Sequence, residues 1–151
     1  MPHLGMRYAL RKLHMDTLSP LDRRRAMSAV KSSNTKPELK VRRLLFSNGY
    51  RYRLHRKDLP GCPDIVLPKY RTVIFVHGCF WHQHDDCPRS KRPASSTEYW
   101  YSKLQRNKDR DARHIVALKS LGWKVLIVWE CQLKDLDAVV NTLRDFLQPS
   151  S

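Results

Sequence analysis

The sequence predicts an α/β domain in which a mixed sheet is flanked by helices, and three observations support this fold class. The chain of 151 residues has the length of about one domain, and its 41% hydrophobic content is too high for a disordered polyelectrolyte. Short β-branched runs bounded by turn residues alternate with segments of helical periodicity. The predicted order is α-α-β-β-β-α-β-α, without a repeat or linker that would divide the domain.

Two helices are predicted before the first strand. The Ser-Pro pair at residues 19–20 suits a helix start, because Ser can cap and Pro is tolerated at the first position, so we expect a helix to about Val30. Thr35 and Glu38 have the spacing of a capping box, which predicts a second helix. Gly49 accepts the left-handed backbone geometry that ends it.

Four segments are predicted to be strands. Residues 50–55 alternate aromatic or apolar with basic side chains, as in a strand with one wet face. Residues 65–67 and 72–76 are short, β-branched and bounded by turns, which predicts adjacent antiparallel strands. Residues 123–129 are apolar apart from Lys124, and we expect them to form a central strand.

Two more helices complete the prediction. Residues 95–98 open a long helix that ends near Gly122, with an apolar stripe through Ile115, Leu118 and Leu121. Apolar residues recur at helical spacing from Leu136 to Leu147, which predicts an amphipathic closing helix.

The charge of the chain predicts a polyanionic partner. The formal net charge is +15 and the pI is about 10.1, and the first sixty residues hold 15 of the 29 Lys and Arg. Such a surface gains affinity for nucleic acid by releasing counterions. The longest apolar run, residues 125–129, is far shorter than the roughly 18 residues of a membrane span. We therefore expect a cytoplasmic protein without a membrane partner, in which residues 1–18 form a disordered basic arm.

The cysteines predict a metal site. Cys79, His84 and Cys87 lie within nine residues, and Cys131 follows a predicted strand. Three thiolates and one imidazole form an established zinc set, and a reducing compartment favours metal ligation over disulfides. Four unrelated buried thiols are the alternative, but the loop between these ligands is too polar to suit a core. Cys62 lies in a turn and is expected to remain unliganded.

Acidic and imidazole side chains near the predicted strands indicate hydrolytic chemistry. Asp64 directly precedes a strand, where a carboxylate can bind magnesium, although a turn aspartate that accepts backbone N–H groups is the alternative. The helix cap alone would likewise account for Glu38. His77 and His82 flank the next strand end, and an imidazole there can take a proton from water.

Two large aromatic residues, Phe80 and Trp81, lie between these histidines. Directly after a strand and inside a polar loop they fit poorly as core residues. Their apolar faces could instead stack on bases or wedge between them.

Four strings of the sequence resemble the very-short-patch-repair (Vsr) DNA mismatch endonucleases. The resemblance runs from about Ser19 to Phe146 and is specific because the strings occur in combination. They are L-P-G-C-P-D-I-V at residues 59–66, V-I-F-V-H-G-C-F-W-H at 73–82, H-x-x-C at 84–87 and G-W-K-V-L-I-V-W-E-C at 122–131.

The resemblance implies a restriction-endonuclease-like domain over residues 19–148, with a structural zinc. The implied enzyme uses Mg²⁺ to nick one DNA strand 5′ to the thymine of a T:G mismatch left by deamination of 5-methylcytosine. We expect a monomer whose partners are mismatched double-stranded DNA and a MutL-type repair ATPase.

The resemblance also implies roles for individual residues. Asp64 and the backbone carbonyl of Val76 match magnesium ligands, His82 matches the general base, and His77 and Glu38 match further active-site residues. The implied zinc ligands are Cys79, His84, Cys87 and Cys131. The side chains that would enter the base stack are Phe80, Trp81 and, from the other groove, Met27.

Two departures from related patterns affect these roles. Restriction-type nucleases usually carry an acid-x-Lys pair where this chain has residues 76–78, Val-His-Gly, so the histidines must carry the mechanism. Some Vsr members have adjacent histidines after the Trp, whereas here Gln83 separates His82 from His84. Either histidine could therefore complete the zinc site.

Overall fold

The structure is a computed structural model that describes Leu21 and residues 33–148. The predicted basic arm at residues 1–18, and the helix expected at residues 19–30 apart from Leu21, lie outside the described residues. Met27 lies there too, so its implied role stays a prediction.

The described strands form one mixed sheet, as the sequence predicted. The strands, in their order across the sheet, are β1 (Arg53–Leu54), β2 (Ile65–Leu67), β3 (Thr72–His77) and β4 (Lys124–Trp129). β1 pairs with β2 and β2 with β3 in antiparallel fashion, whereas β3 and β4 are parallel. The predicted antiparallel pair is therefore confirmed. The parallel pair brings the ends of β3 and β4, and the residues that follow them, to the same edge of the sheet.

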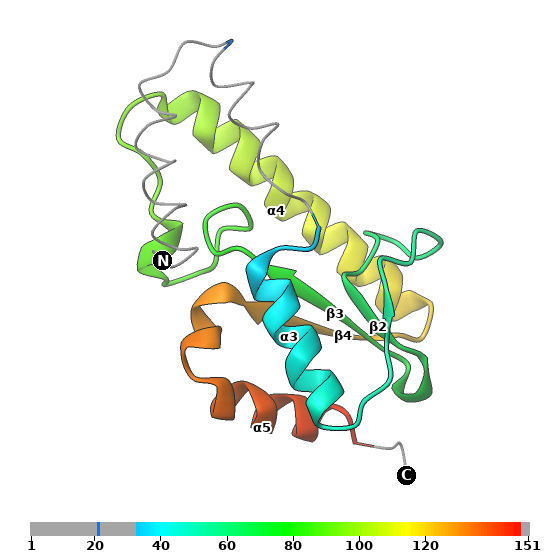
Figure 1. Cartoon of the computed structure of the whole chain (residues 1–151). Helices are drawn as coiled ribbons and strands as arrows, with labels where there is room; N and C mark the ends of the chain where they lie inside the picture. Colours follow the sequence, from blue (N-terminus) through cyan, green and yellow to red (C-terminus); the bar gives the residue numbers. More distant parts are fainter. Residues whose placement is uncertain (1–20, 22–32, 149–151) are drawn as a thin grey trace.

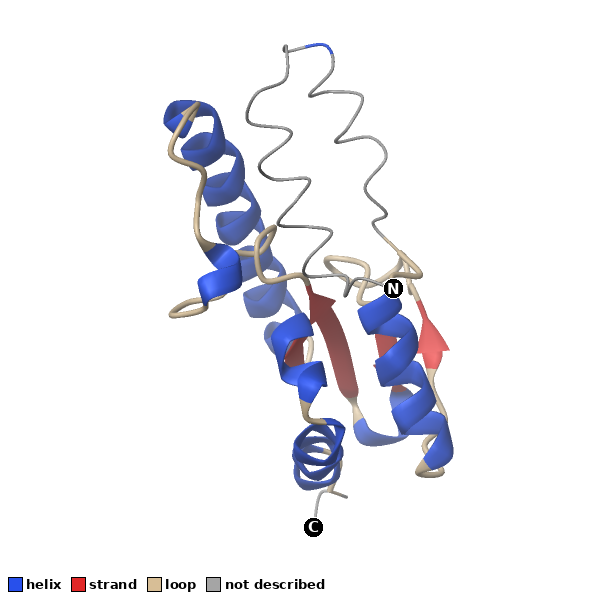
Figure 2. Ribbon diagram, turned by 60° about the vertical axis from the view of Figure 1, so that its left-hand side comes forward, coloured by secondary structure: helices blue, strands red, loops and turns tan. Residues whose placement is uncertain are grey.

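Helices cover both faces of this sheet (Figures 1 and 2). α3 (Lys36–Ser47) and α5 (Leu136–Phe146) lie on one face, and α4 (Thr97–Ser120) lies on the other. Three short 3₁₀ helices, at Pro68–Tyr70, Pro88–Ser90 and Glu130–Lys134, join these elements. The long α4 extends beyond the sheet in Figure 1. The predicted long helix and closing helix are thus confirmed.

Side-chain alternation along the strands builds a core on each face. Ile65 and Leu67 of β2 pack with α3 and α5, whereas Val66 between them packs with Leu118 of α4. All three β2 side chains are fully buried, because each face of the strand has its own helical cover.

The capping prediction for α3 is confirmed in part. Thr35 is the N-cap, and its hydroxyl accepts a hydrogen bond from the backbone N–H of Glu38 at 3.4 Å. The Glu38 carboxylate accepts from the backbone N–H of Asn34 at 2.7 Å, one residue before the cap. Glu38 is only 1% exposed, so it belongs to the interior rather than to a solvated helix end.

Two of the strand predictions need correction. β4 is an edge strand of the described sheet rather than a central one. Its apolar run reflects burial on both faces, because Leu126 and Val128 pack with one core and Val125 with the other. Of the strand expected over residues 50–55, only Arg53–Leu54 pairs with β2.

Two predictions about packing also need correction. Leu121 is 54% exposed, so it does not continue the apolar stripe of α4 past Leu118. Phe80 is only 3% exposed and packs with Trp100 and Leu104 in a third core cluster, although the sequence pattern argued against a core position. The protruding part of α4 supplies the apolar partners that the loop sequence itself does not contain.

Candidate active site and metal centre

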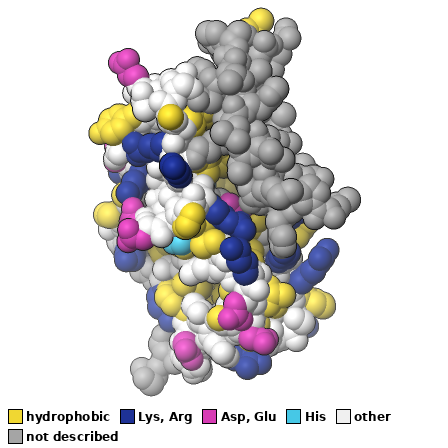
Figure 3. All heavy atoms as spheres, turned by 90° about the vertical axis from the view of Figure 1, so that its left-hand side faces the viewer, with side chains coloured by type: hydrophobic (Ala, Val, Ile, Leu, Met, Phe, Trp, Pro, Cys, Tyr) yellow, Lys and Arg dark blue, Asp and Glu magenta, His cyan; other side chains and the backbone are white. Residues whose placement is uncertain are grey.

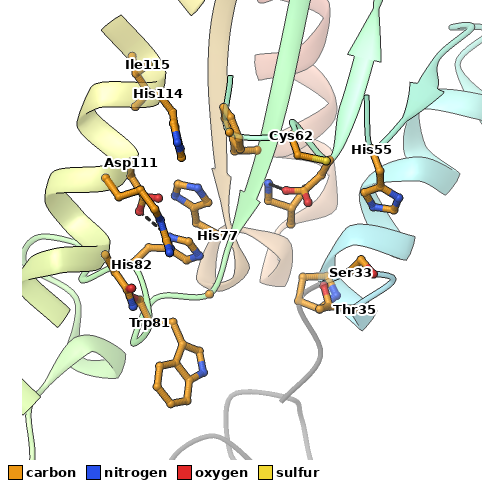
Figure 4. A pocket seen from close by; sticks show the side chains of 18 of the residues that line it. Ser33, Thr35, His55, Cys62, His77, Trp81, His82, Asp111, His114 and Ile115 are labelled. Carbon is orange, nitrogen blue, oxygen red and sulfur yellow. Dashed lines mark hydrogen bonds and ion pairs between the residues drawn. The ribbon is translucent and has the colours of Figure 1, made fainter. Parts of the chain in front are cut away.

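A cavity of about 980 Å³ opens beside the end of β3. Its walls come from the start of α3, the turn before β2, the residues that follow β3, and one side of α4. In Figure 4, Asp111 and His114 of α4 lie on one side, His55 and Thr35 on the other, and His77 between them. The lining residues carry most of the acids and imidazoles selected from the sequence.

Asp64 is fixed at this cavity by the antiparallel pair β2–β3. It directly precedes β2, and its Oδ2 accepts a hydrogen bond from the backbone N–H of Val76 at 2.8 Å. Burial, together with the neighbouring Glu38 carboxyl, raises the pKa of Asp64 to about 7, although the hydrogen bond from Val76 N–H opposes this shift. A cation at this position would favour the ionised carboxylate.

Glu38 lies beside Asp64 and makes several contacts. One carboxylate oxygen, Oε2, accepts from Arg42 as well as from Asn34 N. The other, Oε1, lies 2.9 Å from Nε2 of His55. One ligand atom from each of Glu38, His55 and Asp64 can be chosen so that all three lie within 4.8 Å of one another. These groups can hold a metal ion through two carboxylates and one imidazole.

His82 lies on the other side of the cavity and is held by α4. Its Nδ1 is 2.6 Å from Oδ2 of Asp111. Burial tends to raise the pKa of Asp111, but the hydrogen bond with His82 and the neighbouring positive charges together outweigh burial and leave that pKa below its usual value. An ionised Asp111 accepts a hydrogen bond from Nδ1–H, which leaves Nε2 of the neutral ring as the proton acceptor.

His77, the last residue of β3, stacks on His82. The ring centroids are 3.7 Å apart and the planes differ by 5°. Burial, reinforced by the neighbouring His82, lowers the pKa of His77 to about 3, so His77 is neutral near pH 7. One ligand atom each from His77, His82 and Asp111 also fits within 4.8 Å. Within the described residues, the buried Nδ1 of His77 has no hydrogen-bond partner.

The four predicted metal ligands come together next to this cavity. One ligand atom each from the set fits within 4.8 Å, and Nδ1 of His84 lies 3.5 Å from Sγ of Cys131. Cys79 follows β3 and Cys131 follows β4, so the parallel strand pair brings two of the ligands together. The members of the set are Cys79, His84, Cys87 and Cys131.

This donor set fits zinc, and of the two candidate histidines only His84 lies near the cysteines. His84 groups with the cysteines, whereas His82 groups with His77 and Asp111. Burial raises the pKa of both the Cys79 and the Cys131 thiol, so thiolates here need a nearby cation. Cys62 does not belong to this group of four residues.

The two aromatic residues after β3 occupy different environments. Trp81 lines the cavity and is half-buried, and its backbone carbonyl accepts a hydrogen bond from Asn107 of α4 at 3.1 Å. Phe80 packs edge-on against Trp81, with centroids 4.9 Å apart, and lies below it in the core. Of the two, Trp81 is the one that a ligand in the cavity can reach.

Sequence reasoning missed two members of the site. Asp111 lies among many charged residues of α4, and no local pattern separates it from solvated neighbours. His55 was read only as part of an alternating strand, although it directly follows the last residue of β1. Both residues contact partners that are distant in the sequence, so their place in the site becomes apparent only from the fold.

Comparison with solved structures identifies the class of the fold. The chain resembles the catalytic domain of the homing endonuclease I-Bth0305I with a TM-score of 0.52, over 75% of this chain and 94% of that domain. Sequence identity is 22%, so this likeness concerns the fold alone. The mixed sheet with its flanking helices is therefore the fold of an endonuclease catalytic domain.

Sequence comparison identifies the family. The model of the family described as DNA mismatch endonuclease Vsr matches residues 15–89. The type II nicking enzyme V.XorIIP of Xanthomonas oryzae pv. oryzae is 54% identical over 135 residues, covering 89% of this chain and 98% of the relative. The DNA mismatch endonuclease Vsr of Escherichia coli K12 is 46% identical over 119 residues, covering 79% and 76%. The chain belongs to the Vsr DNA mismatch endonuclease family, whose members are nucleases that act on DNA.

None of the helices that the described residues form is long and apolar enough to cross a membrane.

Proposed function

We propose that this chain nicks one strand of double-stranded DNA 5′ to the thymine of a T:G mismatch, in very short patch repair of deaminated 5-methylcytosine. One observation carries the proposal. In a chain of the Vsr family, a single cavity holds the partly buried Asp64 carboxyl and the His82–Asp111 pair. Hydrolysis of a phosphodiester needs a cation site and a proton acceptor within reach of the same phosphate.

Asp64 and the backbone carbonyl of Val76 are the proposed magnesium ligands. The partly buried Asp64 carboxyl and the adjacent Glu38 supply the oxygen donors that Mg²⁺ prefers, so the residues present fit this ion. When bound, Mg²⁺ neutralises charge on the scissile phosphate and on the leaving oxygen. The hydrogen bond from Val76 N–H fixes the direction of the Asp64 carboxylate.

His82 is the proposed general base, and its partners support this role. Asp111 binds Nδ1–H and orients the ring, so that Nε2 takes the proton of the attacking water. The positive charge that results is stabilised by the Asp111 carboxylate. His77, which is neutral and stacks on the His82 ring, limits the movement of His82 without competing for the proton.

Glu38 is proposed to offer a carboxylate oxygen beside the ion and to hold its neighbours in place, without transferring a proton itself. It holds Arg42, His55 and the backbone of Asn34 around the Asp64 carboxyl. In this position Glu38 orders the polar network on the α3 side of the cavity.

Zinc is proposed to be structural. Cys79, His84, Cys87 and Cys131 form a closed four-ligand set, which is typical of structural rather than catalytic sites. The cluster ties the loop that carries Phe80, Trp81 and His82 to the end of β4, and so holds the proposed base in place.

Recognition of the mismatch is proposed to rely on unstacking. Trp81 enters the stack from the cavity side, with Phe80 behind it, and Met27 enters from the other groove. Opening a stacked step costs a few kcal/mol and costs less at a mismatch, which favours T:G over matched DNA. The enzyme is further proposed to act as a monomer on DNA in the cytoplasm, alongside a MutL-type repair ATPase.

A nicking assay tests the proposal. Matched and T:G-mismatched duplexes of the same sequence are incubated with the full chain in Mg²⁺ or in EDTA, and the broken strand and position are mapped. We expect one nick 5′ to the mismatched thymine, in Mg²⁺ only. Double-strand cleavage of the matched duplex would instead indicate a restriction enzyme of the same fold, and binding without cleavage would indicate a DNA-binding protein.

A variant pair assigns the metal site. Asp64→Asn should abolish nicking and retain DNA binding, because it removes a metal ligand and leaves the cationic surface. Asp58→Asn is the matched control, since Asp58 is exposed and, within the described part of the chain, its side chain pairs only with nearby Arg56. Nicking by Asp64→Asn at the wild-type rate would refute the assignment.

A further inference from the structure

His55 occupies a constrained backbone position beside the proposed magnesium site. It directly follows β1 and has a φ of 45°, in the left-handed region that non-glycine residues seldom adopt. Its backbone N–H donates to the backbone carbonyl of Asp64 at 3.3 Å, which extends the β1–β2 pairing by one residue. Uncommon backbone geometry of this kind concentrates at functional sites.

The side chain of His55 faces the cavity and remains accessible. It lines the cavity wall on the α3 side (Figure 4), and its side chain is 25% exposed. Its Nε2 lies 2.9 Å from Oε1 of Glu38, and both residues belong to the three-residue group with Asp64. Two adjacent ligands of an octahedral ion with bonds of about 2.1 Å are separated by about 3.0 Å, so this spacing suits a shared ion.

Pairing with Glu38 does not by itself account for the histidine. Glu38 already accepts from Arg42 and from Asn34 N, so its charge is compensated without His55. An amide side chain would supply the same hydrogen bond to Oε1. An imidazole differs from an amide in offering a nitrogen lone pair to a metal ion.

We propose that His55 is a nitrogen ligand of the ion held at Asp64 and Glu38, and that it shifts the site toward first-row transition ions such as Mn²⁺ relative to Mg²⁺. The inference rests on the proposed function, because it concerns the same metal site. Imidazole binds transition ions well, whereas Mg²⁺ takes oxygen ligands and keeps its water. His55 is therefore a determinant of metal preference in this chain.

Metal binding without DNA tests the inference. The full, zinc-loaded chain is titrated with Mn²⁺ while free Mn²⁺ is followed by electron paramagnetic resonance, and Mg²⁺ is then added as competitor. In His55→Gln the amide can still donate to Glu38, so the fold and the carboxylates keep their partners. We expect Mn²⁺ affinity to fall about tenfold in His55→Gln, and Mg²⁺ affinity to change less than about threefold.

A spectroscopic signature separates ligation from positioning. A directly bound imidazole nitrogen gives ¹⁴N modulation in the electron spin echo of bound Mn²⁺. We expect this modulation in the wild type and in His82→Gln, and its loss in His55→Gln. Equal Mn²⁺ affinity in wild type and His55→Gln, or modulation that disappears only in His82→Gln, would overturn the inference.

Asp64→Asn separates the two proposals. It should lose binding of both ions, because the shared carboxylate is gone. If it binds Mn²⁺ like the wild type, the magnesium assignment itself fails. If it loses binding while His55→Gln keeps the wild-type preference, the assignment stands and the role of His55 alone is refuted.

Discussion

At the scale of single residues, one hydrogen bond decides which nitrogen of His82 faces the cavity. Asp111 contacts Nδ1 at 2.6 Å, and the stacked His77 ring fixes the plane of the imidazole. The carboxylate contributes orientation, the choice of tautomer and stabilisation of the protonated ring. These effects can be separated by an isosteric substitution.

We expect Asp111→Asn to slow nicking by about 10²-fold, in the range of general base catalysis. The amide oxygen can still accept from Nδ1–H, but the charge that stabilises protonated His82 is lost. Single-turnover nicking of a T:G duplex measures the effect, with DNA affinity measured in parallel. Asp109→Asn is the control, since Asp109 is exposed on the same helix and, among the described residues, its side chain bonds only to Gln105. Equal rates for the two variants would show that Asp111 has no part in the reaction.

At the scale of elements, the turn before β2 sets the position of Asp64 against α4. Gly61 has a φ of +75°, and a Cβ there would lie 2.9 Å from Cβ and Cγ of His114. Gly49 has a similar φ of +83° but no atom within 4 Å of an added Cβ. An alanine at position 49 would therefore introduce backbone strain alone, whereas an alanine at position 61 would introduce backbone strain and a steric clash.

We expect Gly49→Ala to lower the free energy of unfolding by about 1 kcal/mol, the cost of left-handed geometry. Gly61→Ala should lower it by about 2–3 kcal/mol, because His114 must move as well. Urea denaturation of the zinc-loaded proteins measures both values. Equal losses would mean that the turn and α4 adjust to the extra methyl group without cost.

The zinc cluster connects two further elements, the loop after β3 and the end of β4. We expect about one zinc per chain in the wild type and in Cys62→Ser, and none in Cys87→Ser, because Cys62 lies outside the cluster. The melting temperature should fall in Cys87→Ser and on chelation of the wild type, since binding energy at such a site contributes to folding. Elemental analysis and thermal melts provide the test, and a zinc-free wild type would contradict it.

The elements that could be predicted from the sequence are those with a local signal. The Thr35 cap, the turn-bounded strands and the periodic closing helix formed as expected, because each pattern lies within one segment. The position of β4 could not be read in this way, since burial by helices on both faces produces the same apolar run as a central strand. Phe80 likewise gained its core environment from Trp100 on a distant helix.

The same distinction holds for the site. The cysteines and His84 could be selected by spacing within one loop and by a strand end. Asp111 and His55 could not, because their roles depend on partners 29 and 17 residues away in the sequence. In a single sequence, the members of such pairs cannot be distinguished from ordinary charged surface residues.

At the scale of the whole molecule, the net charge of +15 should dominate DNA affinity. Figure 3 shows Lys and Arg side chains spread over one face, and Arg110 of α4 lines the cavity. With about six phosphate contacts, affinity should fall about 10³-fold between 50 and 200 mM salt.

Arg110→Gln should reduce the slope of log affinity against log salt by about 0.9, if it removes one contact. Lys119→Gln, about 13 Å along the same helix and outside the cavity wall, should leave the slope unchanged. Fluorescence anisotropy of a labelled duplex at several salt concentrations measures both slopes. An unchanged slope for Arg110→Gln would mean that DNA does not pass along this side of α4.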